Sequence, residues 1–272
     1  MTEPTAATTS RNGPAASGWA PGELAPRPGA APLGRMLLAQ AATELRLTFR
    51  NGEVVLLTLV IPVLLLVLFT AVPLVDVGGR RVDFLVPGVL ALAVLSTSFT
   101  GLAIATGFER QYGVLKRLGA TALPRGVLIA AKSLGVLAVE AVQAVLLVAV
   151  GLGLGWSPHG SVFAVAGLLV AGTAAFAGLG LLLAGTLKAL TTLVTANFIY
   201  ILLLVGGGVI FPLTSFPSGV RHVLGLLPAA ALSDGLRAVL RQGAAVPVHD
   251  WVTLLVWAAV GLTAAARTFR WE

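Results

Sequence analysis

Long apolar runs alternate with short polar intervals along most of this chain. At a rise of 1.5 Å per residue, a helix of about 20 apolar residues crosses roughly 30 Å of hydrocarbon. Several of the runs reach that length without a charged residue. The pattern therefore predicts an all-α integral membrane protein with six transmembrane helices, at about residues 54–75, 84–107, 127–153, 161–187, 190–211 and 251–268.

Two segments precede the first of these runs. Residues 1–32 are rich in Ala, Pro, Thr, Ser and Gly and show no periodic apolar positions, which predicts a disordered tail. In residues 33–51 the apolar positions recur near a period of 3.6, with charged residues between them. This stretch is typical of an amphipathic helix lying in the membrane interface, although it could also extend the first span into water.

Residues 212–250 carry a patchier pattern, with two short apolar groups on either side of Pro228. We expect two short re-entrant helices that dip into the outer leaflet before the last span. A continuous seventh span would bury Arg221, Asp234, Arg237 and Arg241. Each of these would cost about 2.5 to 3.5 kcal/mol near the middle of the bilayer.

Composition excludes several classes of function. Hydrophobic residues make up 57% of the 272 residues and charged residues 11%, against about 25% charged residues in an ordinary soluble domain. The net charge of +7 does not indicate nucleic-acid binding, because the basic residues follow the loops. There is no cysteine, the three histidines lie far apart, and no Walker A motif occurs. We therefore expect no metal site, no bound cofactor and no ATP hydrolysis by this chain itself.

The basic residues also predict the orientation in the membrane. Six spans place both ends of the domain on one side, and the side that includes the termini holds the larger number of cations near the membrane, eleven against five. Because cytoplasmic loops are enriched in Lys and Arg, both termini are expected in the cytoplasm. The eleven are Arg35, Arg46, Arg50, Arg110, Lys116, Arg117, Arg125, Lys132, Lys188, Arg267 and Arg270; the five are Arg80, Arg81, Arg221, Arg237 and Arg241.

The polar interval from Glu109 to Arg125 is the long charged stretch between two spans. Tyr112, Leu115 and Leu118 recur there at helical spacing, which predicts a short amphipathic helix ending near Gly119. Such a helix can seat in a groove of a partner protein. The alternative is a plain cytoplasmic loop that is basic only because of its topology.

Two ordered motifs resemble a known family. The pattern Glu109-Arg110-x-x-Gly113-x-Leu115-x-Arg117-Leu118, followed by Thr121 and Leu123-Pro124-Arg125, resembles the first cytoplasmic loop of type-2 membrane subunits of ATP-binding-cassette exporters. It is most similar to that of the daunorubicin-resistance-like permeases. Gly207 to Pro212, Phe216-Pro217, Leu227-Pro228 and Asp234 to Arg237 resemble the segment after the fifth helix. The family often has acidic residues where Gln111 and Lys116 stand, and Thr-Pro where this chain has Thr121-Ala122.

The resemblance runs from about Leu37 to the C-terminus and implies a function. The first loop would be the coupling helix that docks on a separate cassette ATPase, which binds ATP-Mg. Two permease copies, or one copy and a paralogue, would form the path for a hydrophobic or amphipathic drug or antibiotic across a bacterial plasma membrane. The coupling residues would be Glu109, Arg110, Tyr112, Gly113, Leu115, Arg117 and Leu118, and the re-entrant segment would include Gly208, Phe211, Pro212, Pro217, Pro228 and Arg237.

A few polar residues lie inside the predicted spans. Glu140 is near the centre of the third, one turn before Gln143, and Lys132 lies about 12 Å away along the axis, too far for a direct pair. Glu140 is therefore protonated, bound to another helix or exposed to a polar cavity. Glu140, Gln143 and Asn197 are candidates for the transport pathway, or for structural hydrogen bonds between helices. The hydroxyls of Ser96, Thr97, Ser98 and Thr100 could likewise contact a substrate or form hydrogen bonds between helices. The glycines of the third and fourth spans favour close helix packing.

Other functions remain open on the sequence. A lipid-linked glycan exporter of the same superfamily would favour a long groove lined by aromatic residues, which make up 7% of this chain. An intramembrane serine protease would need Ser and His at matched depth, but His159, His222 and His249 fall in loops. A membrane protein with a purely structural or assembly role would lack an ATPase partner.

Overall fold

All regular secondary structure in the described residues is helical, as the apolar runs predict. The computed structural model describes residues 30–72, 79–209 and 217–269. The predicted tail at 1–32 thus falls almost entirely outside the described residues, as do Phe211 and Pro212. Contacts separate Met1–Ala31 from a helical unit that begins at Pro32, and the helical unit is described by itself below. Its elements are α1 (Leu33–Arg50), α2 (Gly52–Ala71), α3 (Arg81–Val94), the π-helix η1 (Leu95–Gly101), α4 (Leu102–Gln111), α5 (Val114–Gly119), α6 (Arg125–Gly153), α7 (Val162–Thr186), α8 (Ala189–Gly206), α9 (Ser218–Leu224), α10 (Pro228–Leu240) and α11 (Val248–Thr268).

Six helical stretches of the described chain are long and apolar enough to cross a membrane. They are α2, the continuous run α3–η1–α4, α6, α7, α8 and α11. This confirms the predicted all-α fold with six spans. The second span begins at Arg81 and ends at Gln111, so it extends beyond the predicted 84–107 at both ends and takes in part of the polar interval. The fifth ends at Gly206, short of the predicted residue 211, because the backbone turns at Gly207 and Gly208.

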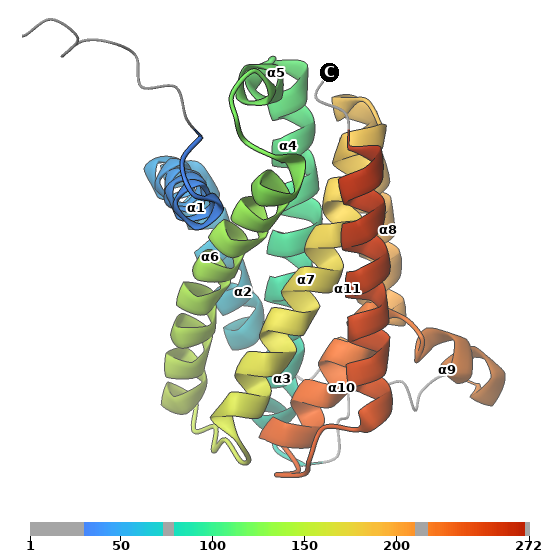
Figure 1. The fold of residues 1–272 in the computed structure, drawn as a ribbon. Helices are drawn as coiled ribbons and strands as arrows, with labels where there is room; N and C mark the ends of the chain where they lie inside the picture. Colours follow the sequence, from blue (N-terminus) through green and yellow to red (C-terminus); the bar gives the residue numbers. More distant parts are fainter. Residues whose placement is uncertain (1–29, 73–78, 210–216, 270–272) are drawn as a thin grey trace, which may run out of the picture. The chain divides into compact units, whose positions relative to one another are not determined.

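The helix α1 is separate from the first span. The chain leaves helical geometry at Asn51, whose side chain accepts a hydrogen bond from the backbone N–H of Val54 and caps α2. Figure 1 shows α1 almost end-on while the spans run vertically, so α1 crosses the direction of the bundle. It packs mainly on α6. A straight extension of α2 into water is therefore excluded.

The helices α9 and α10 form a pair bent by 95°. Pro228 stands in the first turn of α10, where proline needs no helical hydrogen bond. Both helices lie at the end of the bundle opposite α5 (Figure 1), and α10 is buried against α3, α7 and α11. This geometry agrees with two short helices that enter the bundle from one side.

The core of the bundle depends on close helix approach. The most extensive packing joins α7 and α11, which cross where Gly178 meets Gly261. A Cβ atom at Gly178 would lie 2.6 Å from the backbone nitrogen of Leu262, so no larger residue fits there. Small residues at such crossings allow van der Waals packing where lipid provides no hydrophobic drive between helices.

Candidate functional site

The polar interval between the second and third spans is divided into two elements. Glu109 and Arg110 belong to the last turn of α4, and α5 begins only at Val114. Between them Gly113 has a φ of 74°, a left-handed conformation that ends a helix and that glycine adopts without strain. A short amphipathic helix does end at Gly119, as predicted, but it begins only at Val114, so Glu109, Arg110 and Tyr112 are not part of it. The helical spacing of Tyr112, Leu115 and Leu118 continues across Gly113, so the apolar pattern alone does not reveal that the helix is interrupted there.

The two faces of α5 differ in exposure. Leu115 is fully buried and forms a small apolar cluster with Leu128 of α6 and with Phe269, against which Leu118 also packs. Tyr112 is 71% exposed, and Lys116 and Arg117 are exposed as well. Of the predicted coupling residues, Leu115 and Leu118 thus fix α5 to its own bundle. Tyr112 and Arg117 are the ones available to a partner.

Arg110 and Glu109 also point into the protein. An Arg110 guanidinium N–H donates to the backbone carbonyl of Leu187, at the turn between α7 and α8. The carboxylate of Glu109 binds Lys132 of α6, with 2.6 Å between Oε2 and Nζ. These two residues therefore connect the end of α4 to neighbouring helices.

Lys132 is the centre of a three-helix cluster. Its side chain is 1% exposed and lies between Glu109 of α4 and Glu44 of α1, whose Oε2 is 3.0 Å from Nζ. The other oxygen of Glu44 accepts a hydrogen bond from Gln40. We call Lys132, Glu44 and Glu109 the Lys132 cluster. The sequence counted Lys132 among the inner-side cations and found it too far from Glu140 to pair, but nothing in the pattern pairs it with residues on two distant helices.

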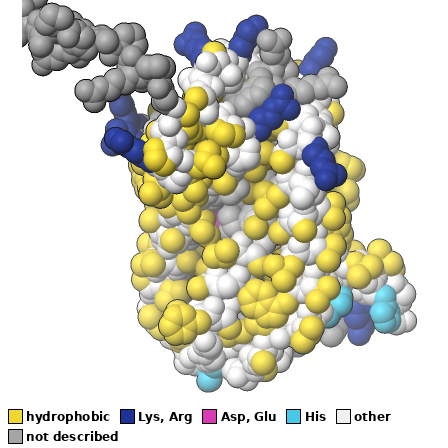
Figure 2. Space-filling view, in the orientation of Figure 1, with side chains coloured by type: hydrophobic (Ala, Val, Ile, Leu, Met, Phe, Trp, Pro, Cys, Tyr) yellow, Lys and Arg dark blue, Asp and Glu magenta, His cyan; other side chains and the backbone are white. Residues whose placement is uncertain are grey.

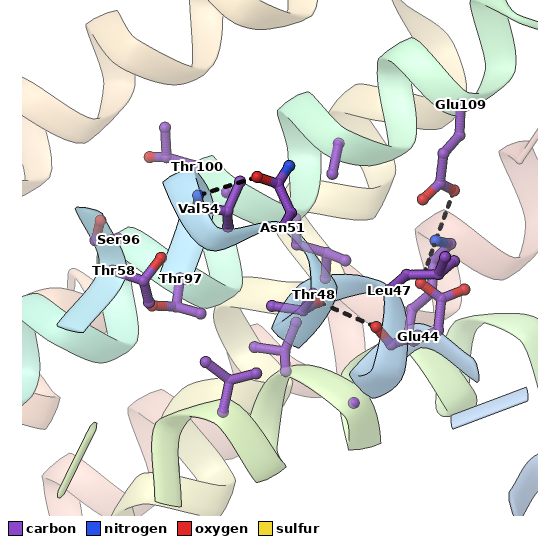
Figure 3. Close-up of a pocket in the computed structure, with 17 residues that line it drawn as sticks. Glu44, Leu47, Thr48, Asn51, Val54, Thr58, Ser96, Thr97, Thr100 and Glu109 are labelled. Carbon is purple, nitrogen blue, oxygen red and sulfur yellow. Dashed lines mark hydrogen bonds and ion pairs between the residues drawn. The ribbon is translucent and has the colours of Figure 1, made fainter. Parts of the chain in front are cut away.

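A cavity of about 430 Å³ lies next to this cluster (Figure 3). It is bounded by α1, α2, η1, α4 and α6. The hydroxyl-bearing and other small polar side chains in its lining are Thr48, Asn51, Thr58, Ser96, Thr97 and Thr100; the apolar ones include Leu47, Val54, Leu102, Ala105, Val136 and Val139. π-Helical segments are rare and are often found at functional sites. Here the segment turns Ser96, Thr97 and Thr100 toward one cavity.

The predicted pathway residues are not brought to one place. Glu140 is buried and accepts a hydrogen bond from the Thr173 hydroxyl of α7, while its Oε1 has no hydrogen-bond partner in the described residues. Gln143 bonds Thr97 and the carbonyl of Thr58, joining η1 to α2. Asn197 is exposed on α8 and donates to Leu193 of its own helix. Glu140 thus has a partner on another helix, and none of the three lines the cavity.

The predicted re-entrant residues are organised by Arg237. Its guanidinium donates to the carbonyl of Val209 at 2.9 Å, lies 3.5 Å from an oxygen of Asp234, and stands 4.1 Å from the ring centroid of Phe84. These contacts tie α10 to α3 and to the end of the fifth span. Gly208 has a φ of 67° in the adjacent turn, Pro217 immediately precedes α9, and Pro228 begins α10.

Comparison with known proteins adds the family. The chain is similar to the protein named "Putative transport permease YvfS" from Bacillus subtilis (strain 168), with 24% identity over 227 residues that cover 81% of this chain and 90% of that protein. A family model described as ABC-2 type transporter matches residues 37–240, which include the cavity, the Lys132 cluster, α5 and α10. This match extends over well more than half of the sequence. The protein is therefore a multi-pass membrane permease that belongs to the ABC-2 type transporter family.

Proposed function

We propose that this protein is the membrane subunit of an ATP-binding-cassette exporter that moves a hydrophobic or amphipathic compound, as the daunorubicin-resistance-like permeases do. A separate cassette ATPase binds ATP-Mg and drives it, and a second permease copy or a paralogue completes the path. Both termini lie in the cytoplasm of a bacterial cell. Its physiological role would be efflux of a drug or antibiotic.

The observation that carries this proposal is how α5 packs on the bundle while part of its surface stays exposed. Lys116 and Arg117 of α5, and Tyr112 just before it, are exposed, and α5 packs on the bundle through Leu115. The preceding α4 is fixed to α6 and α1 through the Lys132 cluster. A displacement of α5 would therefore be transmitted to α4, α6 and α1 together, as expected of an element that receives force from an ATPase.

The distribution of charge supports the orientation. Figure 2 shows Lys and Arg gathered at the end of the bundle that carries α5, above a belt of hydrophobic side chains. Cytoplasmic faces of membrane proteins are enriched in these residues. This distribution supports the proposal that α5 lies on the cytoplasmic side of the membrane, where ATP is present.

The cavity favours a compact cargo over a lipid-linked glycan. About 430 Å³ suits a drug-sized molecule. No aromatic residue is among its lining, whereas the glycan alternative would favour a long aromatic groove. A purely structural role is separated from transport by the experiment below.

The experiment compares two valine substitutions. Val114 on α5 and Val248, the first residue of α11, are both exposed, at opposite ends of the bundle. In the permease–ATPase complex reconstituted in liposomes, we expect Val114→Asp to reduce ATP-dependent uptake of daunorubicin at least tenfold and to weaken ATPase co-purification. Val248→Asp, at a helix N-terminus where an acidic residue is tolerated, should stay within twofold of the unchanged protein. Equal effects of the two substitutions, or no ATP-dependent uptake by the unchanged complex, would contradict the proposal.

A labelling experiment tests the orientation. The natural chain contains no cysteine, so Tyr112→Cys provides a single reactive thiol. An impermeant maleimide should label it in inside-out vesicles and not in intact cells. Labelling in intact cells alone would place α5 on the wrong side for ATP.

A further inference from the structure

The cavity beside the Lys132 cluster has an excess of negative charge at one end. Glu44 and Glu109 contribute two carboxylates to its lining, and Lys132 contributes one ammonium group. Lys132 is almost completely covered, but the side chains of Glu44 and Glu109 remain 18% and 26% exposed. A second cation can therefore approach the carboxylates without displacing the lysine.

The free acceptor at this end belongs to Glu109. Its Oε2 lies 2.6 Å from the Lys132 ammonium but has no hydrogen-bond partner of regular geometry among the described residues, and 26% of the Glu109 side chain remains exposed. Both oxygens of Glu44 are already engaged, one by Gln40 and one by Lys132. An incoming ammonium group would thus find its principal partner in Glu109, with Glu44 as a nearby charge. Charge-assisted hydrogen bonds of this kind are stronger than neutral ones.

The rest of the cavity is amphipathic. Val54, Ala105 and Val136 provide apolar walls from three different helices. The hydroxyl of Thr100 is buried and has no hydrogen-bond partner among the described residues, although buried hydroxyls are usually paired. A ligand with an apolar body and one or two polar atoms matches this lining.

We infer that this cavity is a loading site for an amphiphile with a protonated amine, whose ammonium group binds at Glu109 and Glu44 and whose apolar body lies between α2, η1 and α6. The inference rests on the proposed function, since it locates where cargo is first held within one subunit. The amine can belong to a free compound or to the headgroup of phosphatidylethanolamine. The chemistry of recognition is the same in both cases.

Photolabelling tests the site directly. The full chain in phosphatidylcholine nanodiscs, without ATPase or ATP, is exposed to a dodecylamine that carries a diazirine on its alkyl chain, and the adducts are mapped by mass spectrometry. We expect adducts within residues 54–58 and 96–105. Unlabelled dodecylamine should compete at a concentration at least fivefold lower than dodecanol, which has the same chain and no charge.

Two variants locate the binding mode. Ala105→Phe fills the cavity and should lower labelling at least fivefold, whereas the matched Ala259→Phe, on an exposed position of α11, should not change it. Glu109→Gln should remove the preference for the amine over the alcohol. Thr100→Val, which alters neither charge nor shape, should weaken competition by dodecylamine about threefold. This variant tests the site if Glu109→Gln fails to fold.

The outcomes distinguish a lipid headgroup from a free compound as the source of the amine, and they distinguish the amine site from the exporter function. Suppression of labelling when phosphatidylethanolamine is added to the nanodiscs would support the ammonium site with a lipid as its occupant, and no suppression would support a free compound. Equal competition by dodecanol, or labelling that Ala105→Phe leaves unchanged, would overturn the inference. Because the assay contains no ATPase, such a result leaves the exporter function standing, and a failure of ATP-driven transport leaves the labelling result untouched.

Discussion

The ammonium nitrogen of Lys132 lies 2.6 Å from the Glu109 carboxylate, and this contact joins α6 to the last turn of α4 immediately before α5. The same nitrogen is 3.0 Å from Glu44 of α1. A single buried lysine therefore joins α1, α4 and α6 at the turn of α4 that precedes α5. The first prediction concerns the loss of that lysine.

Lys132→Met should destabilise the protein by roughly 3 kcal/mol, at the lower end of the cost of breaking a buried ion pair, because it leaves two half-buried carboxylates without their cation. Substituting all three residues, with Lys132→Met, Glu44→Gln and Glu109→Gln together, should restore most of the loss. Thermal unfolding of the purified protein in detergent measures both effects. Lys188→Met is the control, since Lys188 is exposed and should tolerate the change. A single variant as stable as the unchanged protein would show that the cluster does not stabilise the bundle.

Gly113→Ala should impair coupling more than folding. The left-handed conformation at Gly113 costs an L residue about 1 to 2 kcal/mol, and relieving this strain would change the angle between α4 and α5. We expect ATP-driven transport to fall several-fold at an unchanged amount of protein in the membrane. Gly219→Ala on α9 is the matched control, because Gly219 has no positive φ and no neighbour within 4 Å of an added Cβ. Equal transport by both variants would argue against a role for the angle of α5.

Glu140→Gln should reduce export and leave assembly intact. The amide oxygen can still accept the hydrogen bond from Thr173, so the packing of α6 on α7 is retained. Thr173→Val is the complementary variant: it removes the bond and should lower stability by about 1 kcal/mol without a matching loss of export. Transport assays and detergent melting curves on both proteins distinguish the two roles. Unchanged export by Glu140→Gln would remove this carboxyl group from the mechanism.

Gly178→Val should prevent the close crossing of α7 and α11. The added side chain would meet the backbone of Gly261 and Leu262, which cannot move without separating the two helices. We expect a large loss of monodisperse protein in size-exclusion chromatography. Gly153→Ala on α6 is the control, since nothing lies within 4 Å of its added Cβ. If Gly178→Val yields the same peak as the control, the crossing is not required for the fold.

The sequence alone predicted the six spans and the break before Pro228, and it left open whether the amphipathic residues 33–51 form a separate helix or extend the first span. Each follows from a one-dimensional property, such as the length of an apolar run or the position of a proline, that acts through the local backbone. It also directed attention to the interval containing Gly113 and Leu115. It did not show that Gly113 divides this interval, because apolar spacing continues on both sides of the break.

Only the tertiary structure decided which polar side chains meet. Lys132 pairs with residues on α1 and α4, Glu140 pairs with Thr173, and the hydroxyls of η1 surround a cavity. The physical reason is that lipid is as apolar as the inside of the bundle, so the composition of a span reveals that it is in the membrane and not which neighbour each face contacts. Hydropathy therefore determined where the chain enters the membrane, and the packing of the helices determined where it can hold a ligand or receive a push.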